Sequence, residues 1–113
     1  MLMEISHRDL APGVVVVAPS GRVIRGPESE QIVTLVEELL RNGTCTIIFD
    51  LAGVRSLDST GIGRFIVCYK EILDAGSKMR MAGVTGHLVD VFHVTRLDTV
   101  FPFYATVEDA AKA

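Results

Sequence analysis

The chain has 113 residues, 49% of them hydrophobic and 22% charged, which is typical of a globular protein with one core, and we expect a single domain over residues 1–113. Its net charge of −3 offers no basic surface for a phosphate backbone and argues against a nucleic-acid partner. The apolar run from Val14 to Ala18 is far too short to span a bilayer, and no signal-peptide pattern is present, so we expect a cytoplasmic protein without direct membrane insertion.

The first part of the chain predicts two short strands and a helix. Val14 to Ala18 and Arg22 to Ile24 read as a hairpin, because Pro19, Ser20 and Gly21 between them carry turn chemistry. Pro27 suits the first position of a helix, since its missing N–H would be unpaired there anyway. The apolar stripe that follows predicts this helix and ends at the left-handed stop of Asn42-Gly43; its members are Ile32, Leu35, Val36, Leu39 and Leu40.

The middle of the chain predicts a buried strand that leads through a short loop to a second helix. Cys45 to Leu51 is almost continuously apolar, as expected of a central strand covered on both faces. From Thr60 to the stop at Gly76, apolar residues again fall on one helical face: Ile62, Phe65, Ile66, Tyr69, Ile72 and Leu73. The two cysteines, Cys45 and Cys68, form no Cys-x-x-Cys pair, so we expect free thiols packed as small hydrophobes.

The last third predicts two more strands and two short helices. Lys78 to Ala82 alternates as a half-covered strand, and a short helix after the loop at Gly83 to Gly86 fits Leu88, Val91 and Phe92. Val100 to Tyr104 reads as an edge strand because Pro102 cannot donate to a ladder, and Thr106 can cap a terminal helix near Asp109. The order β-β-α-β-α-β-α-β-α predicts an α/β fold, a small mixed sheet with helices packed on it.

Motifs of enzymes and cofactor sites are absent from the sequence. No phosphate-binding Gly-x-x-x-x-Gly-Lys loop or Gly-x-Ser-x-Gly elbow occurs, and Gly61-Ile62-Gly63 is too short for a dinucleotide fingerprint. His87 and His93 are six residues apart, which does not bring them onto one helical face as metal ligands. We therefore expect no enzymatic activity, no cofactor and no metal site.

The loop before the second helix is the unusual segment, because an acid, two hydroxyls and two glycines follow one another. Asp58 or Ser59 could simply cap the helix, an interaction worth about 1 kcal/mol. Gly61 and Gly63 are harder to explain, since each costs roughly 0.8 to 1 kcal/mol in a helix relative to alanine. The pattern indicates that something approaches the backbone closely there.

The segment LDSTGIG, Leu57 to Gly63, resembles the signature of the STAS domain of bacterial anti-sigma factor antagonists, and the resemblance extends from about Ile5 to the C-terminal helix. It implies that Ser59 is phosphorylated by an anti-sigma factor that is also a serine kinase, and that a metal-dependent, PP2C-like phosphatase removes the phosphate. The unmodified protein would bind the kinase and free the sigma factor. The resemblance places the partner-binding residues in and near this loop: Asp58, Thr60, Gly61, Ile62, Gly63 and Arg25.

The physics of the loop agrees with such a switch. A phosphate would add about −1.5 to −2 charges at Ser59, and the helix N-terminus would stabilise that charge by about 0.3 to 2 kcal/mol. In an interface without a cation the same charge would cost several kcal/mol, and Asp58 would add repulsion. The glycines would let the nucleotide of the kinase reach the serine oxygen.

One position departs from the family, whose members usually carry an acid after the second strand, where Gly21 to Arg25 of this chain ends in a base. Arg25 either pairs with a phosphate on Ser59 or an acidic partner, or is a solvated arginine at a turn.

Two other functions stay open, as does weak association into a homodimer. A STAS domain can also be a non-switching interaction subunit of a transporter or a signalling scaffold, which would bind through the second helix without a phosphate. The loop could alternatively bind a nucleotide or anion, although few convergent polar groups support that reading.

Overall fold

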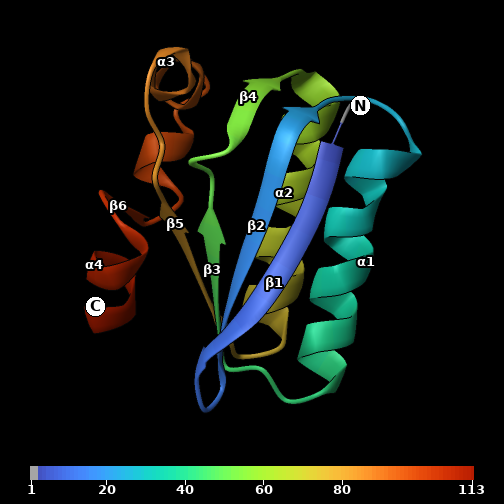
Figure 1. The fold of residues 1–113 in the computed structure, drawn as a ribbon, viewed down its shortest axis with the longest axis vertical. Coiled ribbons are helices and arrows are strands. Elements are labelled where there is room, and N and C mark those ends of the chain that lie inside the picture. The colour runs from blue at the N-terminus through green and yellow to red at the C-terminus, as the bar shows by residue number, and fades with distance from the viewer. Residues whose placement is uncertain (1–2) are drawn as a thin grey trace.

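The computed structural model describes residues 3–113, which form one mixed sheet of six strands with four α-helices and a short 3₁₀ turn (Figure 1). In chain order the elements are β1 (Met3–Ala11), β2 (Val14–Val23), α1 (Pro27–Arg41), β3 (Thr46–Asp50), β4 (Val54–Leu57), α2 (Ser59–Asp74), β5 (Lys78–Ala82), α3 (His87–Val94), η1 (Leu97–Thr99), β6 (Phe103–Tyr104) and α4 (Val107–Lys112). This arrangement confirms the predicted α/β fold.

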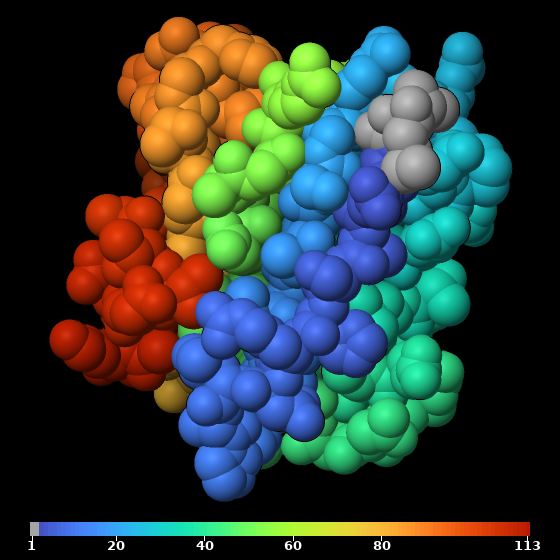
Figure 2. All heavy atoms as spheres, in the orientation of Figure 1, coloured from blue at the N-terminus to red at the C-terminus, as the bar shows by residue number. Residues whose placement is uncertain are grey.

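The sheet has the strand order β1-β2-β3-β5-β6, and β4 pairs with β2 beyond the end of β3. Only β1 and β2 are antiparallel; the other pairs are parallel, as strands joined through helices require. Helices α1 and α2 cover one face, where Phe49 of β3 meets Phe65 of α2 edge to face at 5.2 Å between ring centroids. On the other face α4 covers Val16 and Ile48, whereas β1, most of whose side chains are exposed, lies at the opposite edge of the sheet from α4 (Figures 1 and 2).

The predicted hairpin between residues 14 and 24 is wrong, because this segment is one continuous strand, β2, whose antiparallel partner is β1. The turn lies instead at Pro12 and Gly13, where Gly13 has a φ of 75°. Pro19 is tolerated in β2 because residues 14–17 pair with β3 and residues 21–23 with β4, so Pro19 falls between the two parallel ladders. Since β1 exposes most of its side chains, its sequence carries little apolar pattern.

The predicted short loop from the central strand to the second helix is also wrong, because β4 intervenes. Val54 pairs with Gly21 and Ser56 with Arg22, so Arg55 is an extra residue in β4, a bulge. The bulge lets Val54 and Leu57 both face the core although they are three residues apart. The strict alternation that predicts a strand is therefore lost.

Most other elements confirm their predictions. Helix α1 begins at Pro27, β3 is central, and β6 lies at an edge. It spans only Phe103–Tyr104, shorter than predicted, because the backbone N–H groups of Val100 and Phe101 turn back to the carbonyl of Leu97. Thr106 caps α4, its Oγ1 accepting from the Asp109 amide at 3.0 Å.

The two thiols differ from each other. Cys68 of α2 is fully buried, and burial, followed by the charges of Glu71 and Glu37, raises the pKa of its thiol to about 12. Cys45 is exposed just before β3, so the expectation that both thiols pack in the interior holds for Cys68 alone.

Candidate functional site

The candidate site is the start of α2, which follows β4 at the end of the sheet where β2 also stops. Leu57 of β4 pairs with Val23 of β2, so Asp58 and Ser59 lie just beyond the carboxyl ends of two parallel strands. In open α/β sheets this crevice is where functional groups gather. The bulged strand β4 thus carries the loop to this edge.

Asp58 is the N-cap of α2 and joins two segments of the chain. Its Oδ1 accepts from the backbone N–H of Gly61 at 2.7 Å, and its Oδ2 accepts from the backbone N–H of Arg25 at 2.9 Å. The Gly61 N–H, then the Arg25 N–H, hold the pKa of the Asp58 carboxyl below its ordinary value, because they stabilise the charged form more than partial desolvation opposes it. The residue before Ser59 is therefore an ionised carboxylate that fixes the loop after β2 to the first turn of α2.

The two glycines of the loop have different surroundings. A Cβ on Gly61 would overlap the carbonyl oxygen of Val23 and come within 2.9 Å of its carbonyl carbon. Nothing lies within 4 Å of the corresponding position at Gly63. The sequence predicts a close backbone approach at both glycines. At Gly61 the approaching backbone is that of Val23 in the same chain, whereas the space at Gly63 is open.

The hydroxyl residues lie on different sides of the helix start. Ser59 is exposed, and its side chain makes no hydrogen bond within residues 3–113. Thr60 and Ile62 are half-buried, and Ile62 packs against the core. Thr60 opens onto a groove of about 360 Å³ between α1 and α2, which is lined by Glu30, Val33, Thr60, Gly63, Arg64 and Val67.

Two arginines flank the site, and only one of them was predicted. Arg25 has an exposed side chain and is held at the site through its backbone N–H. Arg64 ties α2 to the start of α1, since its Nε donates to Ser29 Oγ at 3.2 Å and its Nη2 to the carbonyl of Gly26 at 3.3 Å. Ser29 is fully buried. Nothing in the sequence pairs Arg64 with residues 35 to 38 positions earlier, so the sequence carries no signal for this contact.

Helix α2 presents apolar side chains to solvent, two of them in its middle and one near its C-terminal end. Ile66, Val67 and Leu73 are between 45 and 49% exposed. Val67 lines the groove that begins at Thr60, so part of this apolar surface is continuous with the site. Exposed apolar groups next to a polar loop are typical of a protein-docking surface.

Within residues 3–113 the structure contains no group of three or more His, Cys, Asp or Glu side chains that could hold a metal ion. None of the helices in this part of the chain has the length and apolar character that crossing a bilayer demands.

Solved structures of several proteins share this fold. An anti-sigma factor antagonist from Mycobacterium paratuberculosis is 22% identical, with a TM-score of 0.81 over 97% of this chain and 92% of its own. The phosphorylated form of SpoIIAA, a Bacillus cell fate determinant, is 19% identical, with a TM-score of 0.75 over 96% of this chain and 97% of its own. A sulfate transporter family protein from Wolinella succinogenes is 13% identical, with a TM-score of 0.74 over 91% of this chain and 85% of its own. At these identities the similarity establishes the fold.

The family is established by the sequence itself. The family model of the STAS domain matches residues 8–110, which include all of β2 to β6 and the whole Leu57 to Gly63 segment. Together with the order of strands and the capped helix start described above, this match shows that the chain belongs to the STAS domain family.

Proposed function

We propose that this protein is an anti-sigma factor antagonist that works in the cytoplasm as a partner switch. The unmodified protein binds an anti-sigma factor serine kinase and frees the sigma factor, and phosphorylation of Ser59 ends that binding. The observation that carries the proposal is the state of Ser59: an exposed hydroxyl, without an intramolecular hydrogen bond among the described residues, at the N-terminus of a helix whose cap is the preceding residue, Asp58. A PP2C-like phosphatase would reach the phosphate as readily as the kinase reaches the hydroxyl.

The surface next to Ser59 supports docking of a protein. The open space at Gly63 leaves room for a partner close to the backbone, and the exposed side chains of Ile66 and Val67 offer apolar area along the same helix. A phosphate introduced at the edge of that surface would have to lose water on binding. Because Asp58 is already ionised beside it, the added charge would also meet a repelling neighbour.

The free protein should tolerate the phosphate well. The start of α2 is a favourable place for an anion, since unpaired backbone N–H groups and the helix dipole stabilise negative charge there by about 0.3 to 2 kcal/mol. The effect of phosphorylation therefore falls on the complex rather than on the fold.

The first test is phosphosite mapping by mass spectrometry on the protein isolated from its own host across growth and stress conditions. We expect phosphate on Ser59 with an occupancy that changes with condition, lost in Ser59→Ala and kept in Thr60→Ala. Absence of phosphate from Ser59 in every condition, or phosphate confined to Thr60, would contradict the proposed switch. The variant Ser59→Asp should lose affinity for the kinase while its melting temperature stays within a few degrees of wild type.

The side chain of Arg25 is a second candidate contact of the site. We propose that its exposed guanidinium contacts either the phosphate or an acidic group of the partner, because its backbone is fixed one hydrogen bond from Asp58. A contact with an acidic group of the partner predicts that Arg25→Glu weakens binding of the kinase, and Arg22→Glu, also exposed near the end of β2, is the matched control. Unchanged affinity in Arg25→Glu would rule out a contact between Arg25 and the partner.

The alternative function is a non-switching interaction subunit of a transporter or scaffold. The similarity to a sulfate transporter family protein favours keeping it. In that case a membrane transporter would co-purify with wild type and with Ser59→Asp equally, whereas the switch requires that Ser59→Asp loses its partner.

A further inference from the structure

A cavity of about 330 Å³ lies at the edge of the sheet farthest from β1, between the loop after β5, helix α3 and strand β6. Its position is beyond the carboxyl ends of the parallel strands β5 and β6, where ligands of α/β sheets commonly bind. Its volume is at the lower end of the range of small-molecule sites, roughly 300 to 1,000 Å³. None of the Ser59 site residues lines it, so binding in this cavity is independent of the proposed switch.

The lining is aromatic and aliphatic apart from one carboxylate. Phe92 and Phe103 meet edge to face at 5.0 Å between ring centroids, and the other lining side chains include Val84, Val89 and Tyr104. Asp98 is the charged residue of this wall, and no Lys, Arg or His side chain of the described residues lines the cavity. An ammonium group would meet a carboxylate and aromatic side chains there, and the imidazole of His93, which binds the other oxygen of that carboxylate, does not line the cavity.

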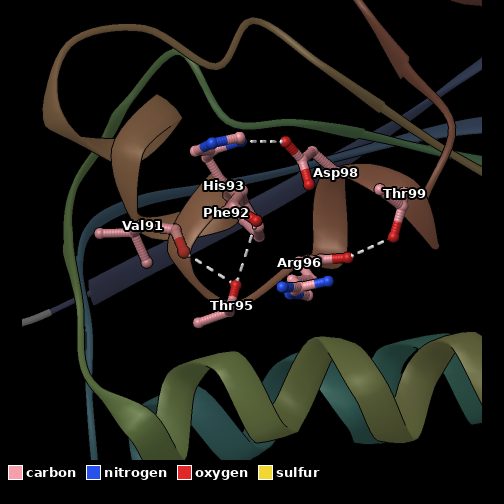
Figure 3. A network of polar contacts seen from close by, with 7 residues as sticks. All are labelled: Val91, Phe92, His93, Thr95, Arg96, Asp98 and Thr99. Atoms are coloured by element: carbon pink, nitrogen blue, oxygen red, sulfur yellow. Dashed lines mark hydrogen bonds and ion pairs between the residues drawn. The ribbon is translucent and has the colours of Figure 1, made fainter.

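Asp98 has one oxygen available. Its Oδ2 accepts a hydrogen bond from His93 Nδ1 at 2.8 Å, as Figure 3 shows. Its Oδ1 makes no hydrogen bond with any residue of the described part of the chain. A ligand can therefore use Oδ1 without displacing His93.

The segment that carries Asp98 is held in place by a network of backbone and hydroxyl contacts (Figure 3). Arg96, between α3 and η1, is left-handed with φ 61°, a rare conformation for a residue other than glycine. On one side of it Thr95 Oγ1 donates to the carbonyl of Val91 at 2.8 Å, and on the other Thr99 Oγ1 donates to the carbonyl of Arg96 at 2.7 Å. Strained backbone that the surroundings hold in place is typical of sites that are formed before their ligand arrives.

We propose that this cavity binds a small primary amine carried by an aromatic or alicyclic ring. The ring packs between Phe92, Phe103 and the aliphatic side chains, and the ammonium group donates a hydrogen bond to Asp98 Oδ1. The ligand class is set by aromatic and aliphatic lining side chains, one carboxylate oxygen that no described residue uses, and the absence of Lys, Arg and His from the described residues that line the cavity.

The probe for this site is benzylamine, added to the full chain at neutral pH and followed by the backbone amide chemical shifts in NMR spectra. We expect saturable shifts at Val84, Val89, Asp98 and Tyr104. Benzyl alcohol, which has nearly the same shape without the charge, should bind about tenfold more weakly because it loses a charge-assisted hydrogen bond. Benzoate should give no saturable shift at these residues.

Three variants separate the site from unspecific binding. Asp98→Asn should weaken benzylamine about tenfold and leave benzyl alcohol unchanged. Val89→Trp should fill the cavity and abolish both, while Val94→Trp, at an exposed position of the same helix that does not line the cavity, should change neither. Equal affinity of benzylamine for wild type and Asp98→Asn, persistence of binding in Val89→Trp, or the absence of saturable shifts in wild type would each overturn the proposal.

Discussion

The α-carbon of Gly61 lies directly against the backbone carbonyl of Val23, with no room for a Cβ between helix α2 and the last residue of β2. The same carbonyl accepts from the backbone N–H of Asp58 at 3.4 Å. The first turn of α2 is therefore seated on the end of β2, and the position of Ser59 depends on this contact.

The first prediction compares the two glycines of α2. Gly61→Ala should destabilise the protein by about 1 to 3 kcal/mol, because the methyl group would push α2 away from rigid backbone. Gly63→Ala should stabilise it by about 0.5 to 1 kcal/mol, since alanine is the better helix residue and nothing lies within 4 Å. Urea denaturation measures both free energies of unfolding, and a change of the same sign in both variants would refute the distinction.

The variant Gly63→Ala also tests whether the open space at Gly63 is needed by the kinase. If the kinase needs open space there, Gly63→Ala should be phosphorylated at Ser59 more slowly than wild type although it is at least as stable. Wild-type phosphorylation kinetics in Gly63→Ala would mean that the open space has no part in the reaction.

The second prediction concerns Asp58, the N-cap of α2. Asp58→Ala should cost about 0.5 to 2 kcal/mol of stability, because the N–H groups of Gly61 and Arg25 both lose their acceptor, whereas Asp58→Asn keeps an acceptor and should cost less. The pKa of Asp58 is lowered in the folded state, so its ionic stabilisation is present above the ordinary value of 3.8 and is lost as the pH falls through the folded-state pKa. Chemical denaturation between neutral and acidic pH measures this, and an acid dependence unchanged in Asp58→Asn would show that Asp58 contributes none of it.

The sequence predicts the features that depend on neighbouring residues, and it misses those that depend on pairing between distant segments. The apolar stripes of α1 and α2 and the capping pair Thr106–Asp109 are local patterns, and the structure confirms the helices and the cap that they predict. The bulge at Arg55 and the exposed strand β1 carry no local pattern, because their pairing depends on β2 from another part of the chain. Asp58 and Ser59 could be located from their types and spacing, but the tie to the Arg25 backbone requires the fold.

The third prediction concerns two acids between α1 and α2. Oε2 of Glu71 is buried and accepts no hydrogen bond among the described residues, and burial, then the neighbouring Glu37, raises the pKa of Glu71. A raised carboxyl pKa gives stabilisation that is complete below 4.5 and is lost as the pH rises through the folded-state value. Glu71→Gln should therefore stabilise the protein at neutral pH by about 1 kcal/mol or less, because solvent reaches part of the side chain.

The matched control for Glu71 is Glu38→Gln, at an exposed position of α1. Melting temperatures of wild type and both variants at mildly acidic and neutral pH give the comparison. A gain that is as large at acidic pH as at neutral pH, or equal in the two variants, would show that the ionised Glu71 is not the cause.

The fourth prediction concerns His93. Its hydrogen bond to Asp98 and the charge of that carboxylate raise the pKa of the imidazole above 6.5, so their stabilising effect is complete below that value and is lost as the pH rises through the folded-state pKa. NMR titration should give His93 a higher pKa than an imidazole without such a partner, and Asp98→Asn should lower it. A titration of His93 that is the same in wild type and Asp98→Asn would show that the pair does not persist in solution.

Because one cysteine is exposed and the other is buried, the protein can be labelled chemically at a single thiol. A maleimide dye reacts with thiolates, so at neutral pH it should modify the exposed Cys45 and leave the buried Cys68 intact. Cys45 begins the run into β3 at the amino ends of the parallel strands, whereas Ser59 follows their carboxyl ends. A fluorophore attached there can report the binding of a partner at Ser59 by anisotropy without occupying the surface that the partner needs.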